Sequence, residues 1–148
     1  MSNNVHFSSS KDDWTTPKEF FDKLNEEFHF TIDLCADDKN HLVDRYFTKE
    51  NSCLDAEFTG ETVFCNPPYG RKNTATFVKK CSELAKMGNT VVMLIPARTD
   101  TAAFHDYIYH KAEIRFVRGR LYFGGARQDR APFPSMVVIF RGVTNGKE

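Results

Sequence analysis

The sequence lacks the features that mark membrane, disulfide-stabilised or metal-binding proteins. Its apolar runs fall far short of the ~20 residues that span a bilayer, and the polar N-terminus, Met1–Ser10, has no apolar signal-peptide core. The 4 cysteines show no C-x-x-C spacing, and the 5 histidines do not pair with them at metal-site spacings. We therefore expect a cytoplasmic protein with reduced, buried thiols, no membrane association and no metal.

A net charge is also lacking, because 20 Lys and Arg balance 20 Asp and Glu over 148 residues. The two signs are nevertheless separated along the chain. Residues 1–61 contain 14 acidic and 6 basic side chains, whereas residues 62–148 contain 6 acidic and 14 basic ones. This separation predicts a basic face, built largely by the second part of the chain and available to phosphates. The alternative is solvated charge that is uneven only in sequence.

The most informative stretch is Thr62–Gly70, which reads T-V-F-C-N-P-P-Y-G. Val63–Cys65 favours a short buried strand. The two prolines that follow cannot donate to a sheet, so the strand must end there in a rigid turn. Open α/β sheets bind ligands at such strand ends, where this turn presents the Asn66 amide, a prolyl carbonyl and the Tyr69 ring. The plainer alternative is an ordinary Pro-Pro turn.

These groups suit the activation of an exocyclic amino group on a nucleic-acid base. The lone pair of that nitrogen is delocalised into the ring, which makes it a poor nucleophile. If the Asn66 side-chain oxygen and the Pro67 carbonyl accept its two N–H hydrogens, the nitrogen can become pyramidal and direct its lone pair at a methyl donor. Tyr69 would stack on the base, which must leave the duplex to reach such a pocket.

The motif Asn66-Pro67-Pro68-Tyr69 resembles the catalytic motif of S-adenosylmethionine-dependent amino-methyltransferases. The chain as a whole resembles the small, phage-type (Dam-like) DNA N6-adenine methyltransferases. The resemblance extends from about Trp14 to Phe140 through an ordered set of motifs. These are W-T-T-P at 14–17, D-L-C-A at 33–36, the Asn66 motif, P-A-R-T-D at 96–100, G-R at 119–120 and F-P-S at 133–135.

The resemblance implies methyl transfer from S-adenosylmethionine to N6 of a flipped adenine in double-stranded DNA, in the bacterial host of a phage or prophage. The catalytic residues would be Asn66, Pro67, Pro68 and Tyr69. The same tetrapeptide serves N4-cytosine, RNA adenine and protein-glutamine methyltransferases, although the glutamine enzymes are longer and carry a glycine-rich cofactor loop that is absent here. A catalytically idle DNA-binding remnant is an alternative of another class.

The resemblance assigns the cofactor to the first part of the chain. The segment around Trp14 would lie beside the methionine part of the cofactor, although Trp14 also suits a hydrophobic staple before a helix. Asp33 would lie near the cofactor's amino group, because a carboxylate suits an ammonium ion; the alternative is a strand-end cap. No Gly-x-Gly follows this strand. The candidate cofactor-binding residues are Trp14, Thr15, Pro17, Asp33, Cys35, Ala36, Asp37 and Asp55.

Only 25 residues lie between Ala36 and Thr62, too few for the two βα units that a full methyltransferase sheet would place there. We expect a compact loop region with one short helix, supplying an acid for the ribose and a wall for the adenine. Ribose candidates are Asp37, Asp38 and Asp44, and adenine-edge candidates are Asn51 and Asp55. Apolar residues should pack this segment on the sheet edge: Leu42, Val43, Tyr46, Phe47 and Leu54.

Seven basic residues are candidates for DNA contacts. Arg71 and Lys72 follow the Asn66 motif in a predicted loop, and Arg98 follows the continuous apolar strand at 90–95, with a salt bridge to Asp100 or Asp37 as its alternative. The stretch 115–130 mixes arginines, aromatics and glycines, which predicts a flexible DNA-reading loop; a solvated connection is its alternative. Its arginines are Arg115, Arg118, Arg120, Arg127 and Arg130, of which the last four are DNA candidates.

Together these patterns predict an α/β fold, a shortened Rossmann-like S-adenosylmethionine-dependent methyltransferase sheet with an antiparallel final strand. The domain would span 14–142, with tails at 1–13 and 143–148. Helices are expected from a Thr16 cap with Pro17 and Glu19 in a capping box, from a Thr74 cap to Gly88, and over 101–110. Strands are expected at 30–34, 63–65, 90–95, 113–117, 121–123 and 136–140.

Overall fold

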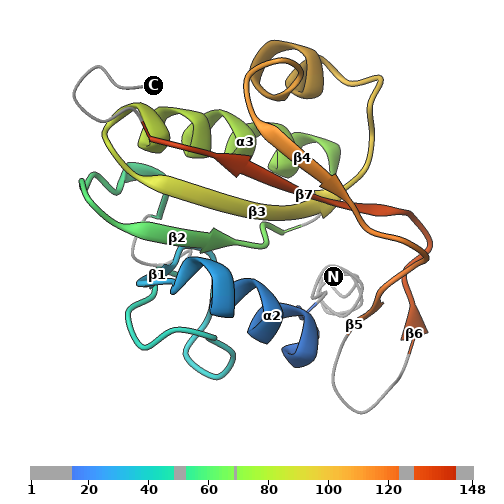
Figure 1. The fold of residues 1–148 in the computed structure, drawn as a ribbon, viewed down its shortest axis with the longest axis horizontal. Helices are drawn as coiled ribbons and strands as arrows, with labels where there is room; N and C mark the ends of the chain where they lie inside the picture. The colour runs from blue at the N-terminus through green and yellow to red at the C-terminus, as the bar shows by residue number, and fades with distance from the viewer. Residues whose placement is uncertain (1–14, 49–52, 69, 124–128, 143–148) are drawn as a thin grey trace, which may run out of the picture.

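The computed structural model describes residues 15–48, 53–68, 70–123 and 129–142, and in these the chain forms a five-stranded sheet in the order β1-β2-β3-β7-β4. The strands are β1 (Ile32–Asp33), β2 (Thr62–Cys65), β3 (Thr90–Pro96), β4 (Glu113–Phe116) and β7 (Ser135–Phe140). The first three are parallel, and β7 runs antiparallel between β3 and β4 (Figure 1). The predicted Rossmann-like α/β sheet with an antiparallel final strand is confirmed.

Helices lie on both faces of the sheet (Figure 1). Helix α3 (Arg71–Lys86) packs Val78, Cys81 and Leu84 on one face, and helix α2 (Lys18–Phe28) packs Phe21 and Leu24 on the other. Successive strand residues point to opposite faces. Coverage of both faces explains why β3 and β7 are apolar along almost their whole length and buried throughout, apart from a half-buried first residue of β3.

Two predicted helix starts are wrong. Helix α2 begins at Lys18 with Pro17 as its N-cap residue and without a side-chain cap, so Thr16 is not the cap. Helix α3 begins at Arg71, three residues before the predicted Thr74 cap, because Gly70 adopts φ +120° and lets the chain turn directly from the prolines into the helix. Residues 71–73, predicted as a loop, therefore form the first turn of α3.

The predicted helix at 101–110 is replaced by a short π-helix, η2 (Phe104–Ile108). The backbone N–H of Tyr109 donates to the carbonyl of Phe104 at 2.8 Å, the five-residue spacing of this helix type. Phe104 and Ile108 are buried and Tyr107 packs against the same core, as predicted. His110 then adopts φ +64°, and the chain leaves for β4.

The short segment between β1 and β2 is the predicted compact loop with one turn of helix, η1 (Cys53–Asp55). Before η1, the segment runs beside β1, where Tyr46 forms a parallel bridge with Asp33. The backbone N–H of Phe47 donates to the Asp33 carbonyl, and the Phe47 carbonyl accepts from the N–H of Ala36, both at 2.9 Å. Leu42, Val43 and Phe47 pack on the core, as expected. Leu54 is 41% exposed, so its predicted packing is wrong; the neighbouring Cys53 and Ala56 are buried instead.

The predicted flexible stretch after β4 contains a paired element. Strands β5 (Tyr122–Phe123) and β6 (Asp129–Arg130) form an antiparallel pair, extended by a hydrogen bond from Ala131 N to Leu121 O at 2.8 Å. Figure 1 shows this hairpin projecting away from the main sheet, beside the first residues of α2. Gly124 and Gly125 lie outside the described residues.

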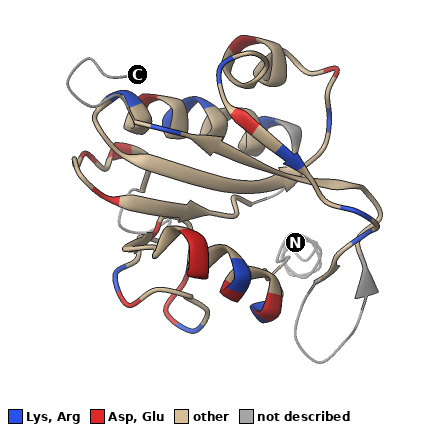
Figure 2. Cartoon of the chain, viewed as in Figure 1, with Lys and Arg blue, Asp and Glu red and all other residues tan. Residues whose placement is uncertain are grey.

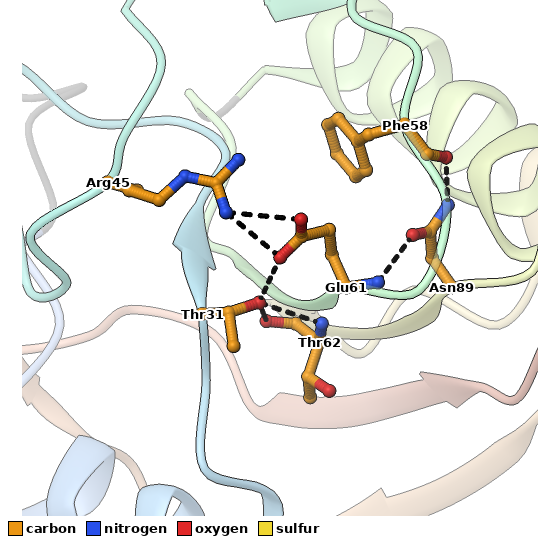
Figure 3. Close-up of polar contacts among 6 residues, drawn as sticks. All are labelled: Thr31, Arg45, Phe58, Glu61, Thr62 and Asn89. Carbon is orange, nitrogen blue, oxygen red and sulfur yellow. Dashed lines mark hydrogen bonds and ion pairs between the residues drawn. The ribbon is translucent and has the colours of Figure 1, made fainter.

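A buried amide, Asn89, joins three segments at the amino ends of the parallel strands (Figure 3). Its Nδ2 donates to the carbonyls of Phe58 at 2.7 Å and Leu84 at 2.8 Å, and its Oδ1 accepts from the backbone N–H of Glu61 at 2.9 Å. The side chain thus ties the end of α3 and the start of β3 to the loop before β2.

Glu61 continues this network toward β1 (Figure 3). Its carboxylate accepts from Thr31 Oγ1 at 2.7 Å and from Arg45 Nη1 at 3.1 Å, and these contacts lower its pKa. Thr31 Oγ1 in turn accepts from the backbone N–H of Thr62 at 3.0 Å. Side chains therefore fix the register of all three parallel strands at this edge.

All four cysteines are free thiols; Cys53, Cys65 and Cys81 are buried and Cys35 is partly buried. Within the described ranges, no helix has the length and apolar character needed to cross a membrane.

Replacement of Asn89 by alanine should lower the free energy of unfolding by about 2–4 kcal/mol, because two carbonyls and one N–H would lose their partner in a buried place. Urea denaturation measures this loss. Asn40→Ala, at an exposed turn, is the matched control and should stay within about 0.5 kcal/mol of the parent. Equal stability of the two variants would show that the hydrogen bonds of the Asn89 side chain are dispensable for stability.

Candidate active site

The carboxyl ends of β1, β2 and β3 form one edge of the sheet, and the predicted site residues follow these ends. The parallel register pairs Asp33 with Phe64 and Cys65 with Met93. The chain therefore leaves β1 into Leu34 and leaves β2 into Asn66 one residue farther along, whereas β3 continues to Pro96 before it leaves into Ala97. This edge lies at the same end of the sheet as the β5–β6 hairpin (Figure 1).

Asn66 is fixed by a contact from a distant part of the chain. Its Nδ2 donates to Thr16 Oγ1 at 2.8 Å across 50 positions of sequence, and Thr16 is only 6% exposed. The Asn66 Oδ1 atom is itself buried, and Pro67 behind it is buried as well. The turn is therefore held from both sides, with the amide nitrogen directed at Thr16.

This arrangement explains the error at Thr16. Thr-Pro-x-Glu has the spacing of a capping box, but the Thr16 hydroxyl bonds the side chain of Asn66 and Glu19 is exposed. Sequence reasoning therefore missed Thr16 as a site residue. Its signal was present only as a second threonine beside the candidate Thr15, before the proline that begins the helix.

Asp33 is the buried charge of the site. It is 3% exposed, and its Oδ2 accepts from the backbone N–H of Leu42 at 3.0 Å. Burial raises the pKa of Asp33 to about 6, although hydrogen bonds from the Leu42 and Cys35 backbones act in the opposite direction. Asp33 thus caps the returning 42–47 segment, and it is also a desolvated carboxylate beside the catalytic turn.

The other cofactor candidates lie at different places. Thr15 and Pro17 flank Thr16, and Cys35 and Ala36 follow Asp33, so these four lie near the same edge and are all partly buried. Asp37 is exposed and accepts from the backbone N–H of Asn40 at 2.7 Å within its own turn.

The loop acids are less closely associated with the edge. Asp38 accepts from the Tyr46 hydroxyl at 2.7 Å, Asp44 is exposed, and Asp55 is exposed on η1. The candidates Trp14, Asn51 and Tyr69 lie outside the described residues. Of the set, the structure brings Asp33 and the 15–17 segment close to Asn66.

A cavity of ≈ 1010 Å³ opens beside Gly70, between the start of α3, the end of β3 and η2. Its floor is apolar, and Gly70, Lys72, Arg98 and Asp100 line its polar part. Its apolar lining includes Val78, Ile95, Phe104, Ile108, Phe133 and Met136. The corrected start of α3 places Lys72 here, in the first helical turn after the prolines.

The side chains of four basic candidates lie in the described part of the chain. Lys72, Arg98, Arg118 and Arg120 are exposed; the guanidinium of Arg98 lies over the Phe133 ring at 5.8 Å, and Arg120 Nη1 donates to Ala131 O at 3.5 Å. Arg127 and the side chains of Arg71 and Arg130 lie outside the described part. Figure 2 shows basic residues along α3 and the β4–β5 connection, and mainly acidic ones on α2 and the loops beside β1 and β2.

Arg115 does not belong with the DNA candidates of its stretch. It donates to both carboxylate oxygens of Glu27, at 2.7 and 2.8 Å, and to Glu113 at 2.8 Å. The bond to Glu27 is the largest cause of its raised pKa. Arg115 therefore joins β4 to α2 and belongs to the fold.

Comparison with known proteins decides the family. The family model described as DNA N-6-adenine-methyltransferase (Dam) matches residues 4–148. The chain belongs to the Dam family. A match of this extent includes both the edge that carries Asn66 and the basic hairpin region.

Two relatives of this Dam-family chain carry the name DNA N-6-adenine-methyltransferase. The protein of Haemophilus phage HP1 (strain HP1c1) is 31% identical over 140 residues, covering 89% of this chain and 80% of the relative. The protein of Escherichia phage T1 is 31% identical over 113 residues, covering 75% of this chain. The chain spans about half the length of the T1 relative, 47%.

A solved structure from Pyrococcus horikoshii, described as a candidate RNA methyltransferase, shares 15% identity at a TM-score of 0.47, covering 70% of this chain and 51% of that one. The fold class of the Dam-family chain follows from its own strand order, not from that likeness.

Asp33→Asn should stabilise the protein at neutral pH, because the wild-type chain must keep a buried carboxylate ionised there. With a folded pKa of about 6 above the usual ~3.9 of an unfolded Asp, the wild-type stability falls as pH rises from about 4 to 6. The variant avoids this loss. The free energy of unfolding of the variant should exceed that of the wild type by roughly 2–3 kcal/mol at pH 7.5, and the difference should nearly vanish at pH 4.

Urea denaturation at the two pH values measures the difference. Asp44→Asn, at an exposed site, is the control and should show no such pH-dependent gain. A variant at Asp33 that is less stable than the parent at pH 7.5 would show that the ionised carboxylate stabilises the fold.

Proposed function

We propose that this chain transfers the methyl group of S-adenosylmethionine to N6 of an adenine flipped out of double-stranded DNA. The observation that carries the proposal is the acceptor geometry at Asn66: a half-buried amide after β2, its nitrogen bonded to Thr16 at 2.8 Å, beside a buried proline. With the amide nitrogen bonded in this way, Oδ1 is the atom that accepts a hydrogen bond.

The exocyclic nitrogen needs two acceptors to become a nucleophile. Asn66 Oδ1 and the Pro67 carbonyl would each accept one N–H of adenine N6, which localises the lone pair and aligns it with the approaching methyl carbon. The two prolines restrict the turn, so the acceptors need little rearrangement when the base arrives. As the N–C bond forms, the methyl–sulfur bond of the donor would break and leave a neutral thioether. N6 would gain the positive charge and release one of its protons to water.

The residues near Asp33 fit a positively charged cofactor. A desolvated carboxylate gains most from a cation placed against it, and Asp33 has such a carboxylate. The cofactor-side residues in this proposal are Trp14, Thr15, Pro17, Asp33, Cys35, Ala36, Asp37 and Asp55. When bound, S-adenosylmethionine supplies an electrophilic methyl group on a sulfonium sulfur.

The DNA would approach from the side of the cavity. Lys72 and Arg98 line it, and both can reach phosphates next to a flipped nucleotide. Arg118 and Arg120 extend this positive charge toward the hairpin, as would Arg71, Arg127 and Arg130. We place the reaction in the cytoplasm of a phage-bearing bacterial host, where double-stranded DNA is the partner.

The direct test is transfer of tritiated methyl groups to unmethylated DNA, followed by nucleoside analysis. Labelled N6-methyladenine supports the proposal. Labelled N4-methylcytosine, or label only in RNA, would assign the chain to another amino-methyltransferase class. DNA binding without cofactor binding by calorimetry would identify an idle remnant.

Asn66→Ala should slow methyl transfer by a factor of about 10²–10³. The reason is that the variant lacks one acceptor for the N–H groups of the base, and the loss of such a group removes about 3–4 kcal/mol of transition-state stabilisation. Cofactor affinity should stay near normal, since Asn66 acts on the base. Asn66→Asp keeps an acceptor oxygen and should retain more activity than the alanine variant. A single-turnover rate near wild type for Asn66→Ala would refute the mechanism.

The double variant Lys72→Ala/Arg98→Ala should flatten the dependence of DNA affinity on salt. Each lost phosphate contact lowers the slope of log affinity against log salt by about 0.9, so the pair should lower it by nearly two. DNA-binding titrations from low to high salt measure the slope. The control is Lys79→Ala/Lys86→Ala, which changes two exposed residues farther along α3. An equal change of the salt slope in both double variants would argue that the DNA does not bind specifically at the cavity.

A further inference from the structure

The hydroxyl of Thr16 accepts a hydrogen bond from the Asn66 amide nitrogen, and this contact comes from outside the turn that carries Asn66. Thr16 lies two residues before α2, the helix that packs on one face of the sheet, whereas Asn66 follows strand β2. The two meet at 2.8 Å although 50 positions separate them in sequence. At 6% exposure, Thr16 is shielded from water that would compete for this bond.

The bond determines what the amide can offer. A carboxamide has one oxygen that accepts and one nitrogen that donates, and the two ends are nearly equal in shape. If the amide turned around, its NH₂ group would face an amino group of the substrate, and two donors would oppose each other. With Nδ2 donating to Thr16, the donor end is engaged and the acceptor end is Oδ1.

We propose that Thr16 is a positioning residue for the reaction: its hydroxyl holds the Asn66 side chain in the plane and orientation that present Oδ1 to the amino group of the base. This inference rests on the proposed function, and it adds a residue that acts through Asn66 rather than on the substrate. It also explains why a threonine in a capping-box pattern leaves the backbone of α2 uncapped.

The position of Thr16 gives the contact a second consequence. Its neighbours Thr15 and Pro17 are on the proposed cofactor side, so one short segment contacts the acceptor and borders the cofactor. Cofactor binding that orders residues 15–17 would also order Asn66. The acceptor would then be fully placed only when the methyl donor is present.

The test compares Thr16→Val, which keeps the shape and removes the hydroxyl, with Thr16→Ser, which keeps the hydroxyl. Thr16→Val should lower the single-turnover rate about tenfold, the effect of one hydrogen bond, while the cofactor dissociation constant by calorimetry changes less than about twofold. Thr16→Ser should recover most of the rate. Thr59→Val is the matched control, because the Thr59 hydroxyl donates to Met87 O at 2.9 Å away from the site, at the other edge of the sheet.

A second measurement does not depend on activity. In nitrogen-15 NMR spectra, the two side-chain N–H signals of Asn66 should move and exchange faster with water in Thr16→Val, and should stay close to wild type in Thr16→Ser and Thr59→Val. Cofactor addition should slow the exchange of these signals in the wild-type protein.

The outcomes separate this inference from the function on which it rests. If Asn66→Ala removes methyl transfer but Thr16→Val keeps the wild-type rate and NMR signals, the positioning role is wrong and the function stands. If Thr16→Val raises only the cofactor KM and leaves kcat unchanged, Thr16 binds cofactor instead and the inference fails. If the wild-type protein methylates no nucleic acid, the proposed function fails, whereas the NMR signals still report whether Thr16 holds the amide.

Discussion

The buried amide of Asn89 is the interaction on which the geometry of this protein most depends. Asn89 joins the end of α3, the loop before β2 and the start of β3 by three hydrogen bonds, and Glu61 extends the set to β1. Even the backbone nearby is constrained, because a Cβ at Gly142 would lie 2.6 Å from the Asn89 carbonyl oxygen. A slip of one residue in a strand moves every later residue by about 3.3 Å and reverses its face. The position of Asn66 at one edge is therefore set by side chains at the other.

The shortness of the segment between β1 and β2 shapes the surroundings of Asp33. Two βα units are missing, and the 42–47 segment takes their place along β1 through the Tyr46 bridge. The Leu42 N–H reaches the Asp33 carboxylate and the segment covers it. As a result, burial disfavours the ionised form of the Asp33 side chain in the isolated chain and raises its pKa. Such a group is costly for the fold and useful for a cation, which is the kind of local conflict found at functional sites.

The sequence predicted the central elements well because their signals are local and strong. An apolar run closed by two prolines defines β2 and its turn, and five consecutive apolar residues, Val91–Ile95, define β3. The predicted start of the first helix failed because a partner distant in sequence, Asn66, engages the Thr16 hydroxyl. The predicted start of α3 failed for a local reason, because a positive φ at Gly70 starts the helix before Thr74. Arg115 lies in the stretch predicted to read DNA, but the ion pair that it forms with Glu27, 88 positions away, is not visible from its neighbours in sequence.

Pairing also decides which charges remain for a ligand. Arg115 is bound by two carboxylates, and the ammonium of Lys80 is buried against the Ala56 carbonyl at 2.6 Å, so neither contributes to a basic face. The exposed cations that remain near the carboxyl edge follow the catalytic turn, β3 and β4. Asn66 lies between these cations and the buried acid Asp33. The separation of charge along the sequence therefore leaves exposed cations on one side of Asn66 and a buried acid on the other, which is the arrangement that the proposed transfer from a sulfonium donor to a nucleic acid requires.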